Sequence, residues 1–181
     1  MPAHGFTLFD TAIGRCGIAW SDDGIAALQL PEATDAATRA RIARTCPAVV
    51  EAPPPPAAEA AIASVAALLR GEPADLSDIA LDLSGVPDFD RRVYAAARAI
   101  PAGRTQTYGA LAARLGDPGA ARAVGGALGR NPVAIIVPCH RVVAAGGAMG
   151  GFSAGGGVAT KRRILAIEGA RGDAPFLPGI L

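Results

Sequence analysis

The apolar and polar positions in the first third of the chain follow the pattern of short β-strands. Brief apolar runs are separated by turn-forming residues such as Ser21-Asp22-Asp23-Gly24, as in a β-hairpin. Further along, Ile79-Ala80-Leu81-Asp82-Leu83 alternates with a period of two, which is typical of a half-buried strand. The pattern therefore predicts strands at residues 6–10, 15–20, 24–30 and 79–83.

Two further segments of this half are predicted to be helices. Residues 35–44 look helical, and residues 57–70 are mostly apolar until Gly71, which is a residue that ends helices. A stiff polyproline stretch, residues 53–56, lies between the two segments. We therefore expect residues 1–84 to form a small α/β N-terminal domain, with a small sheet plus helices, and we find no chemistry in it.

The pattern becomes helical after Ser84-Gly85-Val86-Pro87, where we place the start of a mainly α C-terminal domain, residues 85–181. Over residues 88–100 apolar side chains recur with the period of an α-helix. Two shorter helices follow, over residues 108–115 and 120–128, and a Gly-containing turn joins them. This outline predicts a helix-turn-helix, although short helix pairs also occur in proteins that do not bind DNA.

Charge is distributed unevenly along the chain, although the formal net charge is only +1. In residues 1–87 five arginines oppose eleven acidic residues, a balance of −6, and in the remainder twelve basic residues oppose five acidic ones, a balance of +7. A basic half suggests a polyanionic partner, and an ordinary arginine-rich surface is the alternative. No apolar run approaches the roughly 18 residues of a membrane span. We therefore expect a monomeric, cytoplasmic protein with no membrane contact.

The three cysteines suggest neither a disulfide framework nor a metal site. Cys16, Cys46 and Cys139 are odd in number, and no two of them have Cys-x-x-Cys spacing. His4 and His140 are the only histidines, which leaves too few ligands for a typical four-ligand zinc site. We therefore expect no metal and no other cofactor.

The candidate for chemistry is a cysteine followed directly by a histidine. The apolar run of residues 133–137 leads to Pro138, after which come Cys139 and His140. A thiol is a useful nucleophile only as the thiolate, and both a neighbouring imidazole and the guanidinium of Arg141 favour that form. By itself, the pair is also compatible with a buried structural cysteine beside an incidental histidine.

This Cys-His pair stands within a series of short motifs. In chain order they are Tyr108-Gly109-Ala110-Leu111-Ala112, Ala121-Arg122-Ala123-Val124-Gly125, Asn131-Pro132, Pro138-Cys139-His140-Arg141-Val142, Gly151-Phe152-Ser153 and Ile167-Glu168-Gly169. Together they resemble the O6-alkylguanine-DNA alkyltransferases, also called methylated-DNA–protein-cysteine methyltransferases. The five-residue motif around the cysteine is the most specific, and the resemblance covers about residues 89–170.

The resemblance implies DNA repair by direct reversal. An alkyl group such as methyl would move from O6 of guanine, or from O4 of thymine, onto Cys139, once and irreversibly. His140 would take the thiol proton through a bound water, and Glu168 would hold His140 in the right tautomer. Asn131 would tie the helix-turn-helix to the active-site loop. The resemblance implies no cofactor.

The resemblance also implies how the substrate is bound. The partner would be double-stranded DNA containing O6-alkylguanine, and the damaged base would leave the stack to enter the protein. Arg122 would fill the gap, while Tyr108 would push on the adjacent phosphate. The implied substrate-binding residues are Tyr108, Val142, Phe152 and Ser153, and the implied DNA-binding residues are Tyr108, Ala121, Arg122, Ala123, Gly125 and Arg141.

The predicted recognition helix is unusual for its small residues. Residues 119–129 hold almost no long polar side chain except Arg122, and Gly125 and Gly126 each cost roughly 1 kcal/mol relative to Ala in a helix. Close approach to the narrow minor groove of DNA would explain both glycines. Close packing against a neighbouring helix is the alternative, and we predict that this helix binds the minor groove.

The sequence leaves three other functions to weigh. A non-catalytic alkylguanine-DNA binding protein would lack the nucleophile, so Cys139 argues against it. A helix-turn-helix transcription regulator is expected to carry a dimerisation segment or a sensor domain, and we recognise neither. A Cys-His hydrolase would need an oxyanion hole, for which we find no glycine motif.

Overall fold

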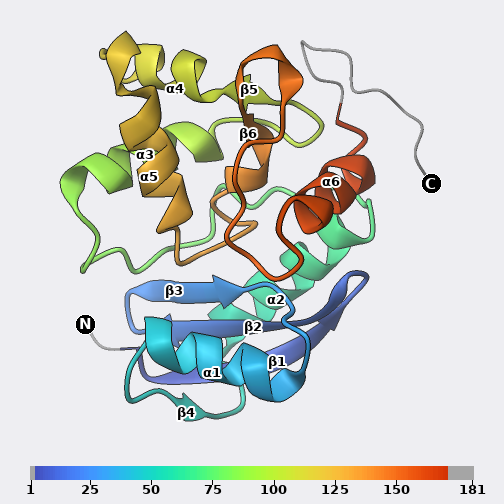
Figure 1. The fold of residues 1–181 in the computed structure, drawn as a ribbon. Coiled ribbons are helices and arrows are strands. Elements are labelled where there is room, and N and C mark those ends of the chain that lie inside the picture. The colour runs from blue at the N-terminus through green and yellow to red at the C-terminus, as the bar shows by residue number, and fades with distance from the viewer. Residues whose placement is uncertain (1–2, 171–181) are drawn as a thin grey trace.

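The structure is a computed structural model, and it describes residues 3–170. Its N-terminal half contains a four-stranded sheet in the order β3-β2-β1-β4 (Figure 1). The first three strands are antiparallel neighbours, and the short β4 pairs parallel to β1. Their bounds are Gly5–Thr11 for β1, Gly14–Ser21 for β2, Gly24–Gln29 for β3 and Val50–Glu51 for β4.

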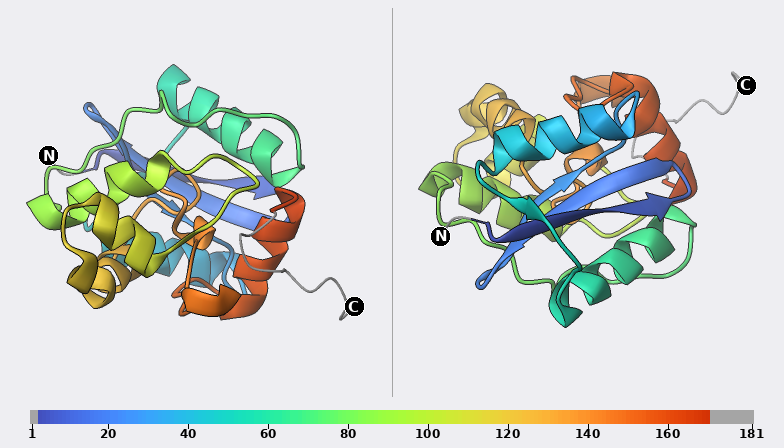
Figure 2. Two further views of the ribbon diagram at one scale, coloured as in Figure 1. Left: turned by 90° about the horizontal axis from the view of Figure 1, so that it is seen from above. Right: turned by 90° about the horizontal axis from the view of Figure 1, so that it is seen from below.

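Two helices cover opposite faces of this sheet (Figure 2). Helix α1, Asp35–Thr45, begins at Thr34, whose side chain accepts a hydrogen bond from the Ala37 amide. Helix α2, Pro56–Leu69, begins with a proline, which needs no hydrogen-bond acceptor at that position. Alternate residues of β2 therefore face different helices, and this is the pattern expected for a strand buried on both sides.

The C-terminal half is mainly helical, as its pattern predicts (Figure 1). Short β5 and β6 pair in parallel beside the helices. The α-helices are α3 Asp88–Arg98, α4 Tyr108–Arg114, α5 Ala121–Gly129 and α6 Gly157–Ile167. The 3₁₀-helices are η1 Pro118–Ala120, η2 Cys139–Arg141 and η3 Ala145–Gly147, and the two short strands are β5 Gln106–Thr107 and β6 Val142–Val143.

The structure corrects the sequence prediction at residues 79–83. These residues do not form a strand, because only Leu81 pairs, through an isolated bridge to Ile25. The amide of Ile25 donates to the Ala80 carbonyl, and the amide of Asp82 donates to the Ile25 carbonyl. The alternation of apolar residues therefore reflects one face packed on the core and not a paired strand.

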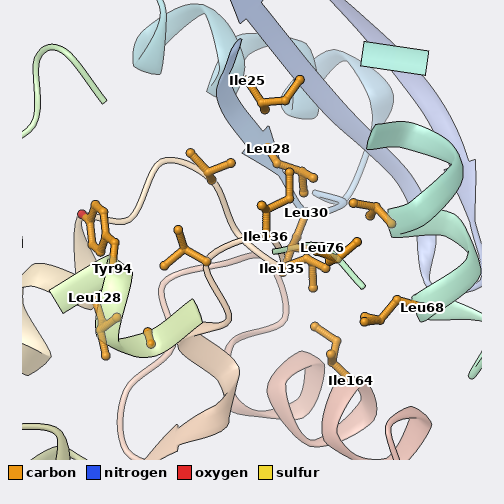
Figure 3. Packing of buried hydrophobic residues seen from close by; sticks show 14 of the residues in the cluster. Ile25, Leu28, Leu30, Leu68, Leu76, Tyr94, Leu128, Ile135, Ile136 and Ile164 are labelled. Carbon is orange, nitrogen blue, oxygen red and sulfur yellow. The ribbon is translucent and has the colours of Figure 1, made fainter. Parts of the chain in front are cut away.

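One continuous core joins the two halves of the chain. Ile25 and Leu28 of β3, and Leu30 directly after it, pack in the same cluster as Ile135 and Ile136 of the C-terminal half (Figure 3). The same edge strand also bonds to that segment, because the amide of Leu28 donates to the Pro132 carbonyl at 2.8 Å. The sheet thus fixes the position of the chain that leads to Cys139. The division into domains at residue 84 stays a prediction.

Candidate active site

An apolar buried segment carries the chain to Cys139. Residues 133–137 bury all their side chains except that of Ala134, and Ile135 lies in the left-handed backbone region, with φ of 71°. That conformation is rare for a β-branched residue and bends the chain sharply. The amide of Val137 then donates to the Val133 carbonyl at 2.9 Å and closes a tight turn. Cys139 follows as the first residue of η2, with its side chain half-buried.

Asn131 links this turn to the end of helix α5. Its side-chain Nδ2 donates to the Val137 carbonyl at 2.9 Å, and its Oδ1 accepts from the Val133 amide at 2.9 Å. One amide side chain therefore satisfies two backbone groups of the segment that leads to the cysteine. The two hydrogen bonds hold both ends of the turn, at Val133 and Val137, so Asn131 helps to fix the position of the Cys139 thiol.

His140 and Glu168 form a buried pair next to the cysteine. His140 Nε2 lies 2.9 Å from Glu168 Oε1, and both side chains are almost fully enclosed. Burial lowers the pKa of His140, which the negative charge of Glu168 only partly opposes, so the ring is neutral at neutral pH. Burial would raise the pKa of Glu168, but the hydrogen bonds from His140 and Arg141 prevail and lower it to about 2.

These charges define the tautomer of the neutral ring. An ionised Glu168 accepts a hydrogen bond, so Nε2 of His140 carries the proton and Nδ1 keeps its lone pair. Nδ1 is buried and has no hydrogen-bond partner among the described residues. His140 is therefore arranged to receive a proton at Nδ1 while Glu168 stabilises the resulting cation.

Arg141 lies inside the protein, where we had expected a DNA contact. Its side chain is nearly buried, and its guanidinium bonds to Glu168 at 2.8 and 3.0 Å and to the Ile100 carbonyl at 2.6 Å. All three nitrogens are thus engaged within the protein. The geometry gives Arg141 a part in holding Glu168 in place, and its side chain is nearly buried.

The structure adds a residue that the sequence analysis missed. Lys161 of α6 is fully buried, and its Nζ donates to the carbonyls of Val142 and Met149, each at 2.6 Å. Nζ also lies 5.9 Å from the centre of the Tyr108 ring. Burial lowers the pKa of Lys161 to about 8, although the nearby Cys139 opposes the change. The one available signal was compositional, since Lys161 is the chain's only lysine.

The thiol of Cys139 experiences opposing influences. Burial raises its pKa, while a hydrogen bond with Asn131 and the positive charge of Lys161 lower it. The net direction is upward, so the resting group is a thiol and must lose its proton before it attacks. His140 is the adjacent group that can accept that proton.

A cavity of about 460 Å³ opens beside Cys139. Tyr108, Phe152 and Ser153 line it together with the cysteine, and no charged residue takes part. Gly150 lets the chain pass close to the Tyr108 ring, because a Cβ there would lie 2.9 Å from the ring and its φ is 67°. Val142 is buried and does not line the cavity, and its carbonyl already accepts from Lys161.

The exposed face of α5 carries the residues expected to meet DNA. Arg122 and Ala123 are exposed, whereas Ala121 and Gly125 are half-buried. Gly125 also lines the cavity, and a Cβ added there would meet the Tyr108 ring at an ordinary contact distance of 3.8 Å. The helix therefore links the cavity with the surface around Arg122.

The fold and the site define a class of protein in which a half-buried cysteine lies beside a buried His-carboxylate pair and lines an uncharged cavity. A family model described as the DNA-binding domain of 6-O-methylguanine DNA methyltransferase matches residues 88–170. The methylated-DNA–protein-cysteine methyltransferase of Mycobacterium bovis is 48% identical over 122 residues, which are 67% of this chain and 72% of that protein. That of Methanothermobacter thermautotrophicus is 36% identical over 153 residues, 84% of this chain and 78% of that protein.

Solved structures give the same result over nearly the whole chain. The Mycobacterium tuberculosis OGT in complex with DNA is 38% identical, with a TM-score of 0.73, and the match covers 95% of this chain and 96% of that one. The O6-methylguanine-DNA methyltransferase of Pyrococcus kodakaraensis is 27% identical, with a TM-score of 0.72 and coverage of 91% and 99%. The chain belongs to the methylated-DNA–protein-cysteine methyltransferase family.

In residues 3–170 no helix is both long and apolar enough to cross a membrane. The same part of the chain holds no group of three or more His, Cys, Asp or Glu residues that could bind a metal ion.

Proposed function

We propose that this protein repairs alkylated DNA by transferring an alkyl group from O6 of guanine, and also from O4 of thymine, to Cys139. The observation that carries the proposal is the half-buried thiol between an uncharged cavity and the His140–Glu168 pair. Family membership supplies the reaction class, and the geometry supplies the groups that the reaction needs.

The substrate requirements match the cavity. A displacement at the alkyl carbon needs an in-line approach of sulfur, which a base inside a duplex does not allow, so the base is flipped out at a cost of a few kcal/mol. The uncharged cavity accepts the neutral base, with Phe152 as an apolar wall. The Tyr108 hydroxyl, the Ser153 amide and the Cys139 carbonyl are the proposed partners of guanine. The Val142 carbonyl, implied by the resemblance, is left out because it already accepts from Lys161 and Val142 does not line the cavity.

The reaction needs one proton to move. His140 takes the proton of the Cys139 thiol at Nδ1 through a water molecule, and Glu168 stabilises the imidazolium. Sulfur then attacks the alkyl carbon, the S–C bond forms, and the electron pair of the C–O6 bond goes to the guanine. The guanine regains a proton, so normal guanine and a thioether are the products. The thioether is not reversed, so each molecule acts once.

DNA binding is assigned to the C-terminal half. Helices α4 and α5 are the proposed helix-turn-helix, with Arg122, Ala121, Ala123 and Gly125 at the minor groove and Tyr108 beside the displaced phosphate. In this proposal residues 85–181 form the DNA-binding and active-site domain, and residues 1–84 form a supporting domain. The protein acts as a monomer in the cytoplasm on double-stranded DNA containing O6-alkylguanine.

Intact mass spectrometry tests the proposal directly. After incubation with duplex DNA containing O6-methylguanine, the mass of the full chain should rise by one methyl group, located on the peptide that contains Cys139. Cys139→Ala should gain nothing, while Cys46→Ala, which changes a cysteine in the separate core cluster beside α1, should still be methylated. Methylation of another residue, or many turnovers per molecule, would refute the assignment.

A further inference from the structure

A second cavity lies on another side of the same cysteine. It has a volume of about 300 Å³, and its walls come from β3, the end of α1, the end of α5 and the segment around Phe152. Cys139, Phe152 and Ser153 line both cavities. Cys139 therefore borders both spaces.

The two cavities differ in charge. The first has no charged residue in its lining, whereas the second is lined by Arg41, Arg44 and Arg130 and by no acidic residue. An uncharged space suits a neutral base, but three guanidinium groups favour a negatively charged occupant. The difference points to separate occupants for the two spaces.

The three arginines are not equally free to act. Arg130 makes two hydrogen bonds of 2.9 Å with Asp90, which neutralises its charge. Arg41 donates to the Ser153 carbonyl at 3.0 Å and lies 3.8 Å from Glu32. The side chain of Arg44, in the last turn of α1, has no hydrogen bond or ion pair with any described residue. Its charge is the one left uncompensated at this cavity.

The in-line geometry of the displacement reaction indicates which cavity a longer alkyl group would occupy. Sulfur, the reacting carbon and O6 lie in line, so the other substituents of that carbon point sideways from this axis. For a methyl group these are hydrogens. For a longer group, with the base in the first cavity and sulfur at the junction, a substituent pointing towards Phe152 and Ser153 enters the second cavity.

We propose that the arginine-lined cavity is a subsite for alkyl groups that carry a carboxylate, so that the protein favours carboxymethyl-type adducts at O6 of guanine. This inference rests on the proposed function. The chemistry is unchanged: the CH₂ carbon forms a bond to sulfur and loses its bond to O6, the carboxylate keeps its charge, and the thiol proton ends on the guanine. Arg44 is the specificity-determining residue that meets the carboxylate.

The test compares two substrates of the same shape. Duplexes carry either O6-carboxymethylguanine or its neutral isostere O6-carbamoylmethylguanine, and single-turnover rates are measured with the full chain. We expect the carboxymethyl group to be transferred about fivefold faster, which is the size of a charge interaction in a partly exposed site. Arg44→Gln should bring the ratio of the two rates close to one, and Arg162→Gln, which removes an exposed arginine of α6, should leave it unchanged.

The outcomes separate this inference from the proposed function. If O6-methylguanine does not methylate Cys139, the proposed function fails. If methyl transfer occurs but the two isosteres react equally, or Arg44→Gln keeps the preference, only the carboxylate subsite is wrong. If Arg44→Gln slows both substrates by the same factor, Arg44 contacts the DNA backbone and the subsite is again wrong.

Discussion

At the scale of single residues, the charge on Glu168 has consequences for both folding and catalysis. It accepts from His140 and Arg141, which are side chains that the fold buries together with it. Removing a charge from such a cluster leaves the other partners buried without compensation. The sequence places His140 and Glu168 28 positions apart, so nothing in their spacing predicts the contact.

We predict that Glu168→Gln slows methyl transfer about a hundredfold, because the imidazolium formed at His140 loses its counter-charge. The double variant His140→Ala with Glu168→Gln should be only slightly slower than either single one, since groups that act as a unit are not additive. Single-turnover rates on O6-methylguanine duplex give the comparison. Losses that multiply in the double variant would mean that the two side chains act independently.

The same substitution should change how stability depends on pH. The pKa of Glu168 is lowered from 4.5 to about 2, so its contribution is fully present above pH 4.5 and is lost as the pH falls towards 2. Glu168→Gln should therefore lower the free energy of unfolding at neutral pH by about 3 kcal/mol. It should also flatten the acid limb of the stability curve. Urea unfolding across this range measures both, and parallel curves for the two proteins would contradict the assignment.

Lys161 gives a second prediction at this scale. Its cation lowers the pKa of the Cys139 thiol, so Lys161→Met should raise that pKa and slow alkylation of Cys139 by iodoacetamide near neutral pH. The pKa of Lys161 itself is about 8, so the difference between the two proteins should shrink above that pH as the wild-type lysine loses its charge. Arg162→Met is the matched control, because it removes an exposed charge from the next residue. An unchanged pH profile for Lys161→Met would refute the interaction.

At the scale of elements, the connection between α5 and the cysteine depends on Asn131. Asn131→Ala should lower the free energy of unfolding by about 1–3 kcal/mol, because it removes the acceptor of the Val133 amide and one of the two donors to the Val137 carbonyl, the other being the Cys139 amide. Asn131→Asp keeps the acceptor for the Val133 amide and loses the donor to the Val137 carbonyl, so it distinguishes the contributions of the two hydrogen bonds. The free energy of unfolding and the methyl-transfer rate should fall together in both variants. Full activity in Asn131→Ala would show that the turn keeps its conformation without the Asn131 side chain.

Helices and strands could be predicted from the sequence where neighbouring residues determine them, and could not where contacts with distant segments do. The hairpin and α1 to α5 follow from the periodicity of apolar residues and from turn residues such as Gly71. The strand predicted at residues 79–83 was wrong, because burial of one face gives the same alternation of apolar residues in a segment that is not a paired strand. Helix α6 was not anticipated, because it begins after a glycine-rich stretch and its buried Lys161 is satisfied only by distant carbonyls.

The residues of the candidate site also fall into those that the sequence identified and those that only the structure revealed. The cysteine, the histidine and the small-residue helix were identified from motifs. The inward position of Arg141, the part played by Lys161 and the charge of the second cavity were not, because each depends on segments that meet only in the folded chain. The resemblance supplied the importance of Glu168, but only the structure gives its contact with Arg141.

At the scale of the whole molecule, the proposal that α5 meets DNA depends on the small residues of its surface. Intramolecular packing does not require the glycines of this helix: a Cβ at Gly126 would meet only the Arg130 guanidinium, at 3.4 Å, and one at Gly125 only the Tyr108 ring. Their cost to the helix, roughly 1 kcal/mol each, therefore favours the other explanation, close approach to a nucleic acid. The minor groove is narrow, about 6 Å across, and carries little sequence information. A helix with small side chains fits it, and weak sequence preference suits a repair protein.

We therefore predict that bulk on α5 weakens duplex binding. Ala123→Leu should lower the affinity for duplex DNA about tenfold, since the larger side chain holds the helix away from a groove of about 6 Å. Ala95→Leu, an equal change at an exposed position of α3, should have no such effect. Affinities are measured by fluorescence anisotropy at several salt concentrations, because phosphate contacts make binding fall steeply with salt. A ligand that fills the minor groove should compete with the wild-type protein, while bulky substituents in the major groove should not. If major-groove substituents block binding, or Ala123→Leu binds as well as Ala95→Leu, α5 does not enter the minor groove.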